Sequence, residues 1–251
     1  MPADGHSAHG GASNAGSNSS RMRRELVACG RRLLARGLLM QTSGNLSIRL
    51  DEDIYITPSS LEYDRIDPDD IVVLGLDGSV RSCPKGRSPS SESPLHQLVY
   101  EARSDVSAIV HTHSGFATTL AILGTPIPAV HYMIATLETT EVAVAPYATY
   151  GTEALARSVR DAFAGPARAI LLANHGMLAV GKTLEQAADA AECLERLAEF
   201  YYRARILGTP NILTSTQMAE VFEKYHAKVP PAASSSEESE LHADAAGRRE
   251  L

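Results

Sequence analysis

Cysteine is scarce in this 251-residue chain, which has only three: Cys29, Cys83 and Cys193. An odd number of cysteines, none of them in a CxxC or Cys/His spacing, argues against a disulfide framework and against a thiolate metal site. We therefore expect all three side chains to be reduced and to take no part in the chemistry.

Long apolar runs are also lacking. No stretch approaches the roughly 18 consecutive apolar residues that a membrane-spanning helix requires. The first residues contain no apolar segment of the kind found in secretion signals. We therefore expect a cytoplasmic protein without a membrane partner.

Basic residues are outnumbered, with 23 Lys and Arg against 30 Asp and Glu, and the formal net charge is -7 at pH 7. Nucleic-acid binding depends on clustered basic side chains that neutralise phosphates. We therefore expect no nucleic-acid partner. A small phosphorylated ligand stays possible, because one local pocket can hold it whatever the overall charge.

The length and the 44% hydrophobic content suffice for one sizeable core, so we expect a single domain over residues 21–228. Residues 1–20 are mostly Gly, Ser, Ala and Asn, and residues 229–251 are rich in Ser, Glu and Ala. Neither stretch offers enough apolar surface to offset the entropy of ordering. We expect both to be disordered tails.

Strand and helix patterns alternate along the predicted domain, and no internal repeat is present. Alternating apolar residues around a turn at 51–53 predict an antiparallel hairpin, and residues 142–145 predict a further strand. Ser93 and Pro94 are typical of a helix start, and Thr183 with Gln186 forms the capping pair of a long helix. These patterns predict a mixed, largely antiparallel sheet with helices on both faces.

Two histidines lie two residues apart in Val-Ser-Ala-Ile-Val-His-Thr-His, residues 106–113. This run is rich in β-branched residues and predicts a strand, on which His111 and His113 project to the same face. Two adjacent imidazoles supply half of a zinc site, which needs one or two further ligands. By itself the pair favours ordinary hydrogen-bonded histidines over a metal site.

Further ligands are available elsewhere in the chain. His175 follows an apolar run at 169–173 and precedes a glycine that permits a close turn. Glu92 comes immediately before the helix start at Ser93 and offers a carboxylate. Three histidines and one glutamate would make a catalytic divalent-metal site.

At this point the sequence resembles the class II aldolase/adducin family, and within it the L-fuculose-phosphate aldolase branch. The resemblance covers about residues 21–226, and it implies a three-layer α/β/α fold around a mixed, mostly antiparallel sheet. The motifs that carry it, in chain order, lie at residues 42–47, 56–59, 90–92, 111–113, 127–134, 145–152 and 174–176.

The resemblance also implies the roles of the metal-site residues. The family's zinc ligands correspond to His111, His113 and His175, with Mn²⁺ or Co²⁺ as alternatives to Zn²⁺. Glu92 corresponds to the carboxylate that approaches the metal at rest and acts as acid and base in turnover. Tyr132 corresponds to a tyrosine that reaches a neighbouring subunit's active site, so a homotetramer with active sites at subunit interfaces is implied.

A phosphate site is implied as well, and it contains no Lys or Arg. Hydroxyls, an amide and backbone N–H groups near a helix start can all donate to a phosphate dianion. Taken singly, the same motifs would be no more than turns and a helix cap. The implied phosphate-binding residues are Gly44, Asn45, Ser59, Ser60, Ser90 and Ser91.

The chain departs from the family pattern in three places. Ser60 stands where the aldolase often has glycine, and Tyr150 stands where it has phenylalanine. The segment after Tyr225 does not align with the tyrosine-bearing tail of the family. The last two departures affect the end of the pocket that would face the aldehyde.

The implied reaction is reversible cleavage of a ketose 1-phosphate into dihydroxyacetone phosphate and a small aldehyde. A deoxy sugar such as fuculose 1-phosphate or a 5-deoxypentulose 1-phosphate would fit the aromatic, weakly charged far end. One alternative is a pentulose-5-phosphate 4-epimerase, although an Asp typically follows the Ser pair there and Glu92 favours the aldolase. The others are a thio-sugar-phosphate dehydratase and a noncatalytic adducin-like module, which lacks the zinc histidines.

Overall fold

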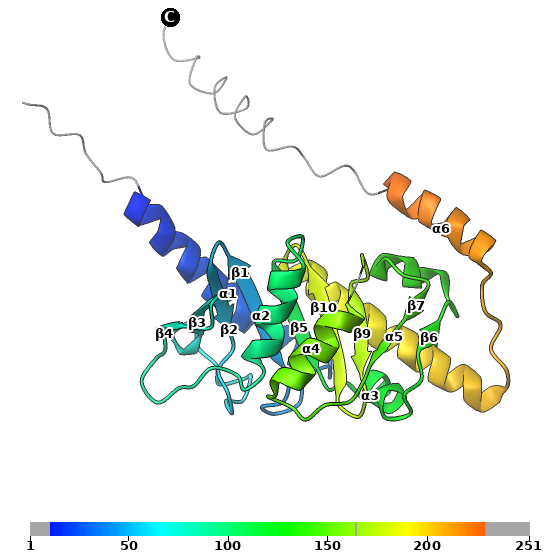
Figure 1. Ribbon diagram of the computed structural model, residues 1–251, viewed down its shortest axis with the longest axis horizontal. Coiled ribbons are helices and arrows are strands. Elements are labelled where there is room, and N and C mark those ends of the chain that lie inside the picture. Colours follow the sequence, from blue (N-terminus) through cyan, green and yellow to red (C-terminus); the bar gives the residue numbers. More distant parts are fainter. Residues whose placement is uncertain (1–10, 164, 229–251) are drawn as a thin grey trace, which may run out of the picture.

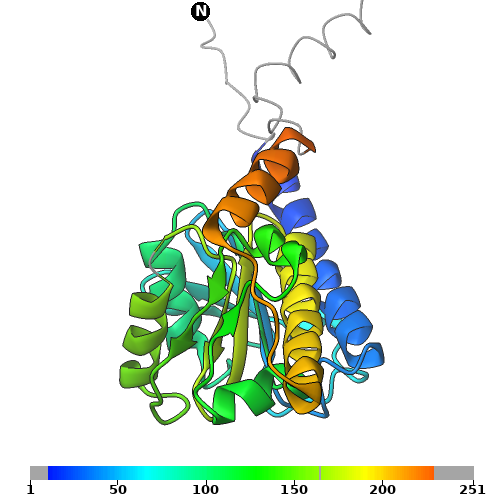
Figure 2. The ribbon, with the colours of Figure 1, turned by 90° about the vertical axis from the view of Figure 1, so that its right-hand side faces the viewer.

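A computed structural model describes residues 11–163 and 165–228, which form three layers with a sheet in the middle (Figures 1 and 2). The sheet has eight strands in the order β4-β3-β2-β1-β5-β10-β9-β8. The strands are β1 (Asn45–Leu50), β2 (Asp53–Ile56), β3 (Val72–Gly75), β4 (Val80–Ser82), β5 (Ala108–Thr112), β8 (Val144–Ala145), β9 (Ala169–Leu172) and β10 (Gly176–Gly181).

Helices cover both faces of this sheet. In Figure 2, α2 and α4 lie on one side of the strands and α5 and α1 on the other. The α-helices are α1 (Gly11–Ala35), α2 (Ser93–Ala102), α3 (Gly115–Ile122), α4 (Glu153–Ala162), α5 (Leu184–Leu207) and α6 (Ser215–Lys228), and two 3₁₀ helices are η1 (Pro68–Asp70) and η2 (Tyr132–Leu137). A second, two-stranded sheet pairs β6 (Ile127–Pro128) with β7 (Glu141–Val142).

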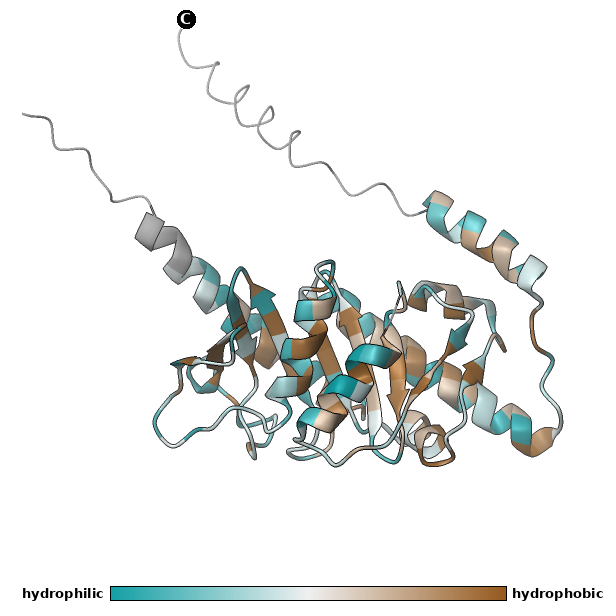
Figure 3. Cartoon of the chain, viewed as in Figure 1, coloured by the Kyte–Doolittle hydropathy of each residue, from teal (hydrophilic) through white to brown (hydrophobic). Residues whose placement is uncertain are grey.

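Two apolar clusters fill the spaces between the layers, and the central strand β5 contributes to both. Ile109 packs into the cluster with Leu95 and Val99 of α2. Ala108 and Val110 point the other way, toward α1, α3 and α5. In Figure 3 the strands behind α2 and α4 are largely apolar, and these two helices carry both polar and apolar residues. Because side chains alternate along a strand, His111 lies on the α2 and α4 side with Ile109.

The predicted fold is confirmed: the described strands pair antiparallel except for β8 and β9, which run parallel. One prediction within it is wrong. Residues 142–145 were expected as one strand, but Val142 pairs with Ile127 in the small sheet and Val144 pairs with Leu171 in the large one. The chain passes from one sheet to the other within two residues.

The N-terminal boundary also differs from the prediction. Helix α1 begins at Gly11, so residues 11–20, expected to be disordered, are helical. Once the amphipathic part from Met22 onward has nucleated the helix, adding further turns costs little. The rest of that predicted tail, and the predicted tail at 229–251, lie outside the described residues. Among the described helices, none combines the length and apolar character that crossing a membrane requires.

Candidate metal centre and active site

The four candidate ligands predicted from the sequence come together at one edge of the sheet. His111 lies near the end of β5, and His113 follows directly after that strand. His175 lies in the turn between β9 and β10, and Glu92 is the residue before α2. One potential ligand atom from each residue lies within 4.8 Å of those of all the others.

The turn that carries His175 is held tightly against β5. Asn174 adopts a left-handed conformation with φ of 55°. At Gly176 an added Cβ would lie 2.4 Å from the carbonyl oxygen of Thr112, so no larger residue fits without a backbone shift. The close pairing of β10 with β5 therefore sets where His175 stands relative to His111 and His113.

Hydrogen bonding fixes which imidazole atom faces the centre of the cluster. The Nδ1 atom of His111 lies 2.8 Å from the carbonyl oxygen of Met177, to which it donates. The Nε2 atom is therefore the one with a free lone pair, and it lies 3.0 Å from Nε2 of His113. Such an outer contact to a carbonyl is typical of metal-binding histidines.

The Glu92 carboxylate bridges two of the histidines. Its Oε2 atom lies 3.2 Å from Nε2 of His111, and its Oε1 atom lies 3.2 Å from Nε2 of His175. Oε2 also accepts a hydrogen bond of 2.9 Å from the Asn45 amide. Oε1 is buried and has no hydrogen-bond partner among the described residues.

The surroundings shift the pKa values of these four side chains in different directions. Burial alone would raise the pKa of Glu92, but the adjacent His111 and His175 and the Asn45 amide hold it far below its usual range. Burial would lower the pKa of His111, yet the neighbouring carboxylate raises it overall. Burial, together with the charge on His111, lowers the pKa values of His113 and His175 to about 4.

This donor set fits a divalent cation. Three imidazole nitrogens and one carboxylate oxygen are ligands that zinc and similar ions accept. Two Nε2 atoms 3.0 Å apart and a buried Oε1 atom without a partner both indicate a position for a shared cation. The residues that could hold it are Glu92, His111, His113 and His175.

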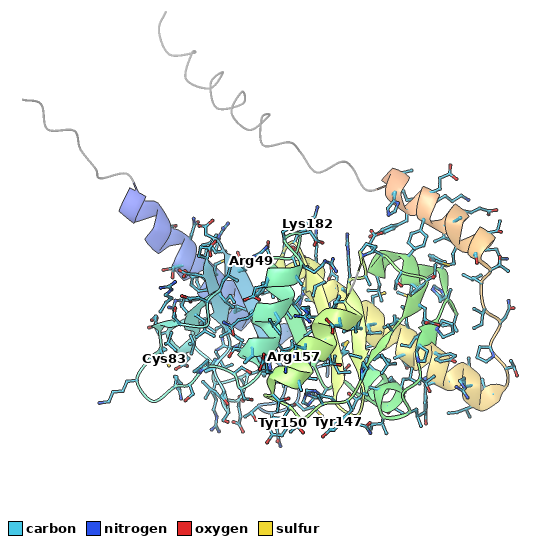
Figure 4. The ribbon with its side chains drawn as sticks, viewed as in Figure 1. Arg49, Cys83, Tyr147, Tyr150, Arg157 and Lys182 are labelled. Atoms are coloured by element: carbon cyan, nitrogen blue, oxygen red, sulfur yellow. The ribbon has the colours of Figure 1, made fainter. Side chains whose placement is uncertain are left out.

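A cavity of about 330 Å³ opens beside these residues. Tyr147 and Tyr150 line it, and their side chains lie at the lower edge of the molecule in Figure 4. Tyr150 was predicted to lie near the aldehyde end of the pocket, whereas no role was predicted for Tyr147. None of the described lining residues is Lys or Arg: they are Ser91, Glu92, His113, Tyr147, Ala148, Tyr150, Asn174 and His175.

The serines predicted to bind phosphate lie next to this cavity. Pro58 and Pro89 form a β-bridge, and the Ser59 N–H donates to the carbonyl of Ser88 at 2.9 Å. These contacts bring the Ser59-Ser60 turn beside the Ser90-Ser91 segment that leads into α2. Ser60 has a φ of 57°, which explains why glycine suits this position in the related pattern. The phosphate role of the four serines stays a prediction.

Gly44 and Asn45 have structural roles as well. Gly44 has a φ of 81°, and an added Cβ would lie 2.6 Å from the carbonyl oxygen of His111. The Asn45 amide nitrogen donates to Glu92, and the Asn45 carbonyl oxygen faces His96 at 2.6 Å. An amide nitrogen carries two N–H donors, so the predicted contact of Asn45 with phosphate stays compatible with this arrangement.

Tyr132 lies apart from the cavity. It is the first residue of η2, is 62% exposed, and stacks on His131 with ring centroids 4.5 Å apart. Within the described part of a single chain it is not among the cavity's lining residues. Its predicted contact with a neighbouring subunit's active site is therefore not tested by one chain.

Three residues of the site were missed by the sequence analysis: Ser47, His96 and Tyr100. They form a buried row of hydrogen bonds that ends at Asn45 and Glu92. A signal was present, because Glu92, His96 and Tyr100 are four residues apart along α2 and Ser47 is two residues after Asn45 on β1.

Comparison with known proteins agrees with this arrangement. The profile described as "Class II Aldolase and Adducin N-terminal domain" matches residues 24–202. The chain belongs to the class II aldolase/adducin family, as the motifs predict.

Three of the similar proteins are all named as aldolases that act on a sugar 1-phosphate. A 5-methylthioribulose-1-phosphate/5-deoxyribulose-1-phosphate aldolase from Rhodospirillum rubrum is 42% identical over 204 residues, 81% of this chain and 90% of the relative. A 5-deoxy-D-ribulose 1-phosphate aldolase from Bacillus thuringiensis serovar kurstaki is 42% identical over 207 residues, 81% of this chain and 94% of the relative. A solved L-fuculose 1-phosphate aldolase has a TM-score of 0.79 at 40% identity, covering 82% of this chain and 97% of its own.

Proposed function

We propose that this protein is a divalent-metal-dependent aldolase that reversibly cleaves a ketose 1-phosphate into dihydroxyacetone phosphate and a small aldehyde. The observation that carries the proposal is the cluster of Glu92, His111, His113 and His175 at the mouth of a cavity flanked by serines. Zinc is the expected ion, with Mn²⁺ or Co²⁺ as substitutes. When bound, the ion supplies a Lewis acid that polarises the ketose carbonyl.

Glu92 is assigned the proton transfer. In the cleavage direction the bond between the third and fourth carbons breaks, and its electron pair passes toward the carbonyl. Glu92 then delivers a proton to the third carbon, which completes dihydroxyacetone phosphate; in synthesis it removes the same proton. Oε1 accepts no hydrogen bond among the described residues and is assigned this exchange, whereas Oε2 is held by Asn45.

The substrate is held by its phosphate at one end. Ser59, Ser60, Ser90 and Ser91 donate to the phosphate, together with backbone N–H groups where α2 begins. The far end meets Tyr147 and Tyr150, which favour a short, weakly polar group over a charged one. A 5-deoxypentulose 1-phosphate or fuculose 1-phosphate meets both requirements, and the names of the relatives from R. rubrum and B. thuringiensis support the former.

The working form is proposed to be a homotetramer. Tyr132 is largely exposed and lies off the cavity of its own chain, beside the partly buried His131 and Met133. A tyrosine in this position can serve the cavity of an adjacent subunit, where in cleavage it would take the proton released by the hydroxyl of the fourth carbon and in synthesis it would return that proton. Light scattering that gave a monomeric mass for a fully active sample would contradict the tetramer.

The central test combines metal analysis with product detection. The full chain, dialysed at neutral pH, should retain about one divalent ion per subunit and should release dihydroxyacetone phosphate from 5-deoxyribulose 1-phosphate. Chelator should abolish the activity, and added Zn²⁺, Mn²⁺ or Co²⁺ should restore it. His113→Ala serves as the control for metal bound elsewhere, including at His6 and His9, outside the described residues.

Two results would overturn the proposal. One is wild-type protein that holds no stoichiometric ion and shows no cleavage with any added divalent ion. The other is a clear preference for a pentulose 5-phosphate that is epimerised and not cleaved, which would also remove the role given to Glu92.

A further inference from the structure

A buried row of polar side chains runs from the interior of the protein to Glu92. The Tyr100 hydroxyl lies 2.7 Å from Ser47 Oγ, which lies 2.6 Å from His96 Nδ1. His96 Nε2 lies 2.6 Å from Asn45 Oδ1, and Asn45 Nδ2 lies 2.9 Å from Glu92 Oε2. All five residues are less than 9% exposed, and Ser47 and His96 are fully buried.

The row forms where polar side chains on one face of β1 contact polar side chains on one face of α2. Asn45 and Ser47 are two residues apart on β1 and share one face of the sheet, and Asn45 is directly opposite His111 on β5. Glu92, His96 and Tyr100 are four residues apart and share one face of α2. Packing α2 on the sheet therefore places one polar line against the other within an otherwise apolar layer.

The hydrogen bonds in this row can run in only one direction. Ionised Glu92 only accepts, so the Asn45 amide must present its nitrogen to Glu92 and its oxygen to His96. His96 must then donate from Nε2 and accept at Nδ1 from the Ser47 hydroxyl, which in turn accepts from Tyr100. Burial lowers the pKa of His96 to about 3, so its neutral ring has one donor and one acceptor, as the row requires.

Such a row is costly unless every member is satisfied, because a buried polar group without a partner loses its hydration. Apolar side chains of similar size would fill the same layer at a lower cost. The only member that touches the reaction cavity is Glu92, at the end toward which all the donors point. The hydrogen bonds of the row therefore serve to orient the Glu92 carboxylate.

We propose that His96 is a positioning residue for Glu92: by donating from Nε2 it selects the amide orientation in which Asn45 donates to Oε2. That contact fixes the plane of the carboxylate and leaves Oε1 without a hydrogen bond, 3.2 Å from Nε2 of His175. Without His96 the Asn45 amide is free to turn, and Glu92 loses the donor that holds its reactive atom in place. This inference rests on the proposed function, in which Glu92 exchanges a proton with the substrate carbon.

The test follows proton exchange alone, with dihydroxyacetone phosphate as the probe. Exchange of its third-carbon hydrogen in D₂O, measured by proton NMR, needs Glu92 but no aldehyde. For metal-loaded His96→Leu we expect the exchange rate at saturation to fall 10- to 100-fold, the range typical of residues that orient a metal site. Metal content should match the wild type, because the hydrogen bonds of His96 go to Ser47 and Asn45 and not to the three candidate histidine ligands.

Two further variants separate positioning from stability. His96→Gln keeps an N–H donor toward Asn45 and should restore the rate to within about fivefold of wild type. Val99→Ala removes buried volume from the same helix and should lower the urea concentration at which the protein unfolds. Because Val99 takes no part in the row, its exchange rate should equal that of the wild type.

If His96→Leu does not fold, Ser47→Ala replaces it. That variant frees Nδ1 of His96, removes the preference for one tautomer, and should slow exchange by about three- to tenfold. A wild-type exchange rate in His96→Leu, or in Ser47→Ala if His96→Leu does not fold, would overturn the inference, and so would activity lost only in proportion to metal. Failure of the wild type itself to exchange the proton would instead overturn the proposed function.

Discussion

The two ends of the proposed active site are built in opposite ways. The end that carries the chemistry is buried and braced: His111 is fully buried, Glu92 is 7% exposed, and hydrogen bonds hold both. The end that would meet the aldehyde is open, with Tyr147 62% and Tyr150 69% exposed. Bond breaking thus relies on fixed geometry, whereas substrate choice is left to side chains that can change without disturbing the core.

Removing a candidate metal ligand from the buried end of the site should have the largest effect. His113→Ala reduces three imidazoles to two, and we expect metal and activity to be lost together, because two histidines rarely retain zinc. Metal analysis and a cleavage assay on the same dialysed sample would measure this. Retention of a stoichiometric ion at wild-type affinity would contradict the assignment.

Glu92→Gln tests the same end without removing a histidine. The amide keeps the shape of the side chain but cannot exchange a proton, so activity should fall by about 10² to 10⁴ while metal stays bound. Metal content and kcat, measured on the same sample, distinguish this outcome from that of His113→Ala. Equal metal loss in the two variants would contradict the separate roles.

The buried histidines should also determine how the stability of chelator-treated protein depends on pH. His96 has a pKa lowered to about 3, and His113 and His175 have pKa values lowered to about 4, mainly by burial. Between pH 4 and about 6.5 the unfolded chain therefore binds protons that the folded chain does not. Stability should fall as the pH drops through this window, by up to about 1.4 kcal/mol per pH unit for each histidine.

His111 acts in the opposite sense and at higher pH. Its raised pKa means that the folded protein binds the extra proton above about pH 6.5, so stability falls there as pH rises. Urea unfolding of the chelator-treated protein should consequently give a maximum near pH 6.5. His113→Leu should flatten the acidic side of that curve, and an unchanged slope would contradict the burial-induced shift.

Changes at the open end should be the smallest. Tyr150→Phe removes one hydroxyl from an exposed ring, and a single polar group in such a pocket shifts discrimination by about 1 to 3 kcal/mol at most. We expect the ratio of kcat/KM for fuculose 1-phosphate to that for 5-deoxyribulose 1-phosphate to change by about tenfold, with kcat for the better substrate nearly unchanged. A large loss of kcat would show that Tyr150 belongs to the chemistry.

The sequence was informative where one local pattern decides the outcome. Two histidines on a strand must share a face, so their proximity was predictable, and the Ser93-Pro94 pair located the helix start beside Glu92. Strand alternation likewise predicted the antiparallel sheet. These features need only the periodicity of one element.

The features that the sequence did not predict depend on how separate helices, strands and loops pack against one another. The partners of Ser47 and His96 become apparent only when α2 lies on β1, and a helix pattern and a strand pattern give no relative register. Tyr147 was missed because a loop's direction depends on what surrounds it. The division of residues 142–145 between two sheets was missed because a run of four apolar and small residues does not specify its partner.

The hydrogen bond from His111 to the carbonyl of Met177 has a practical consequence. It joins a candidate ligand to the backbone of the neighbouring strand, so the imidazole keeps its orientation through contacts that require no ion. The same purified sample should therefore tolerate repeated stripping and reloading without refolding. A series of ions, including spectroscopically visible Co²⁺, can then be compared on one unaltered scaffold, and differences in rate can be assigned to the ion itself.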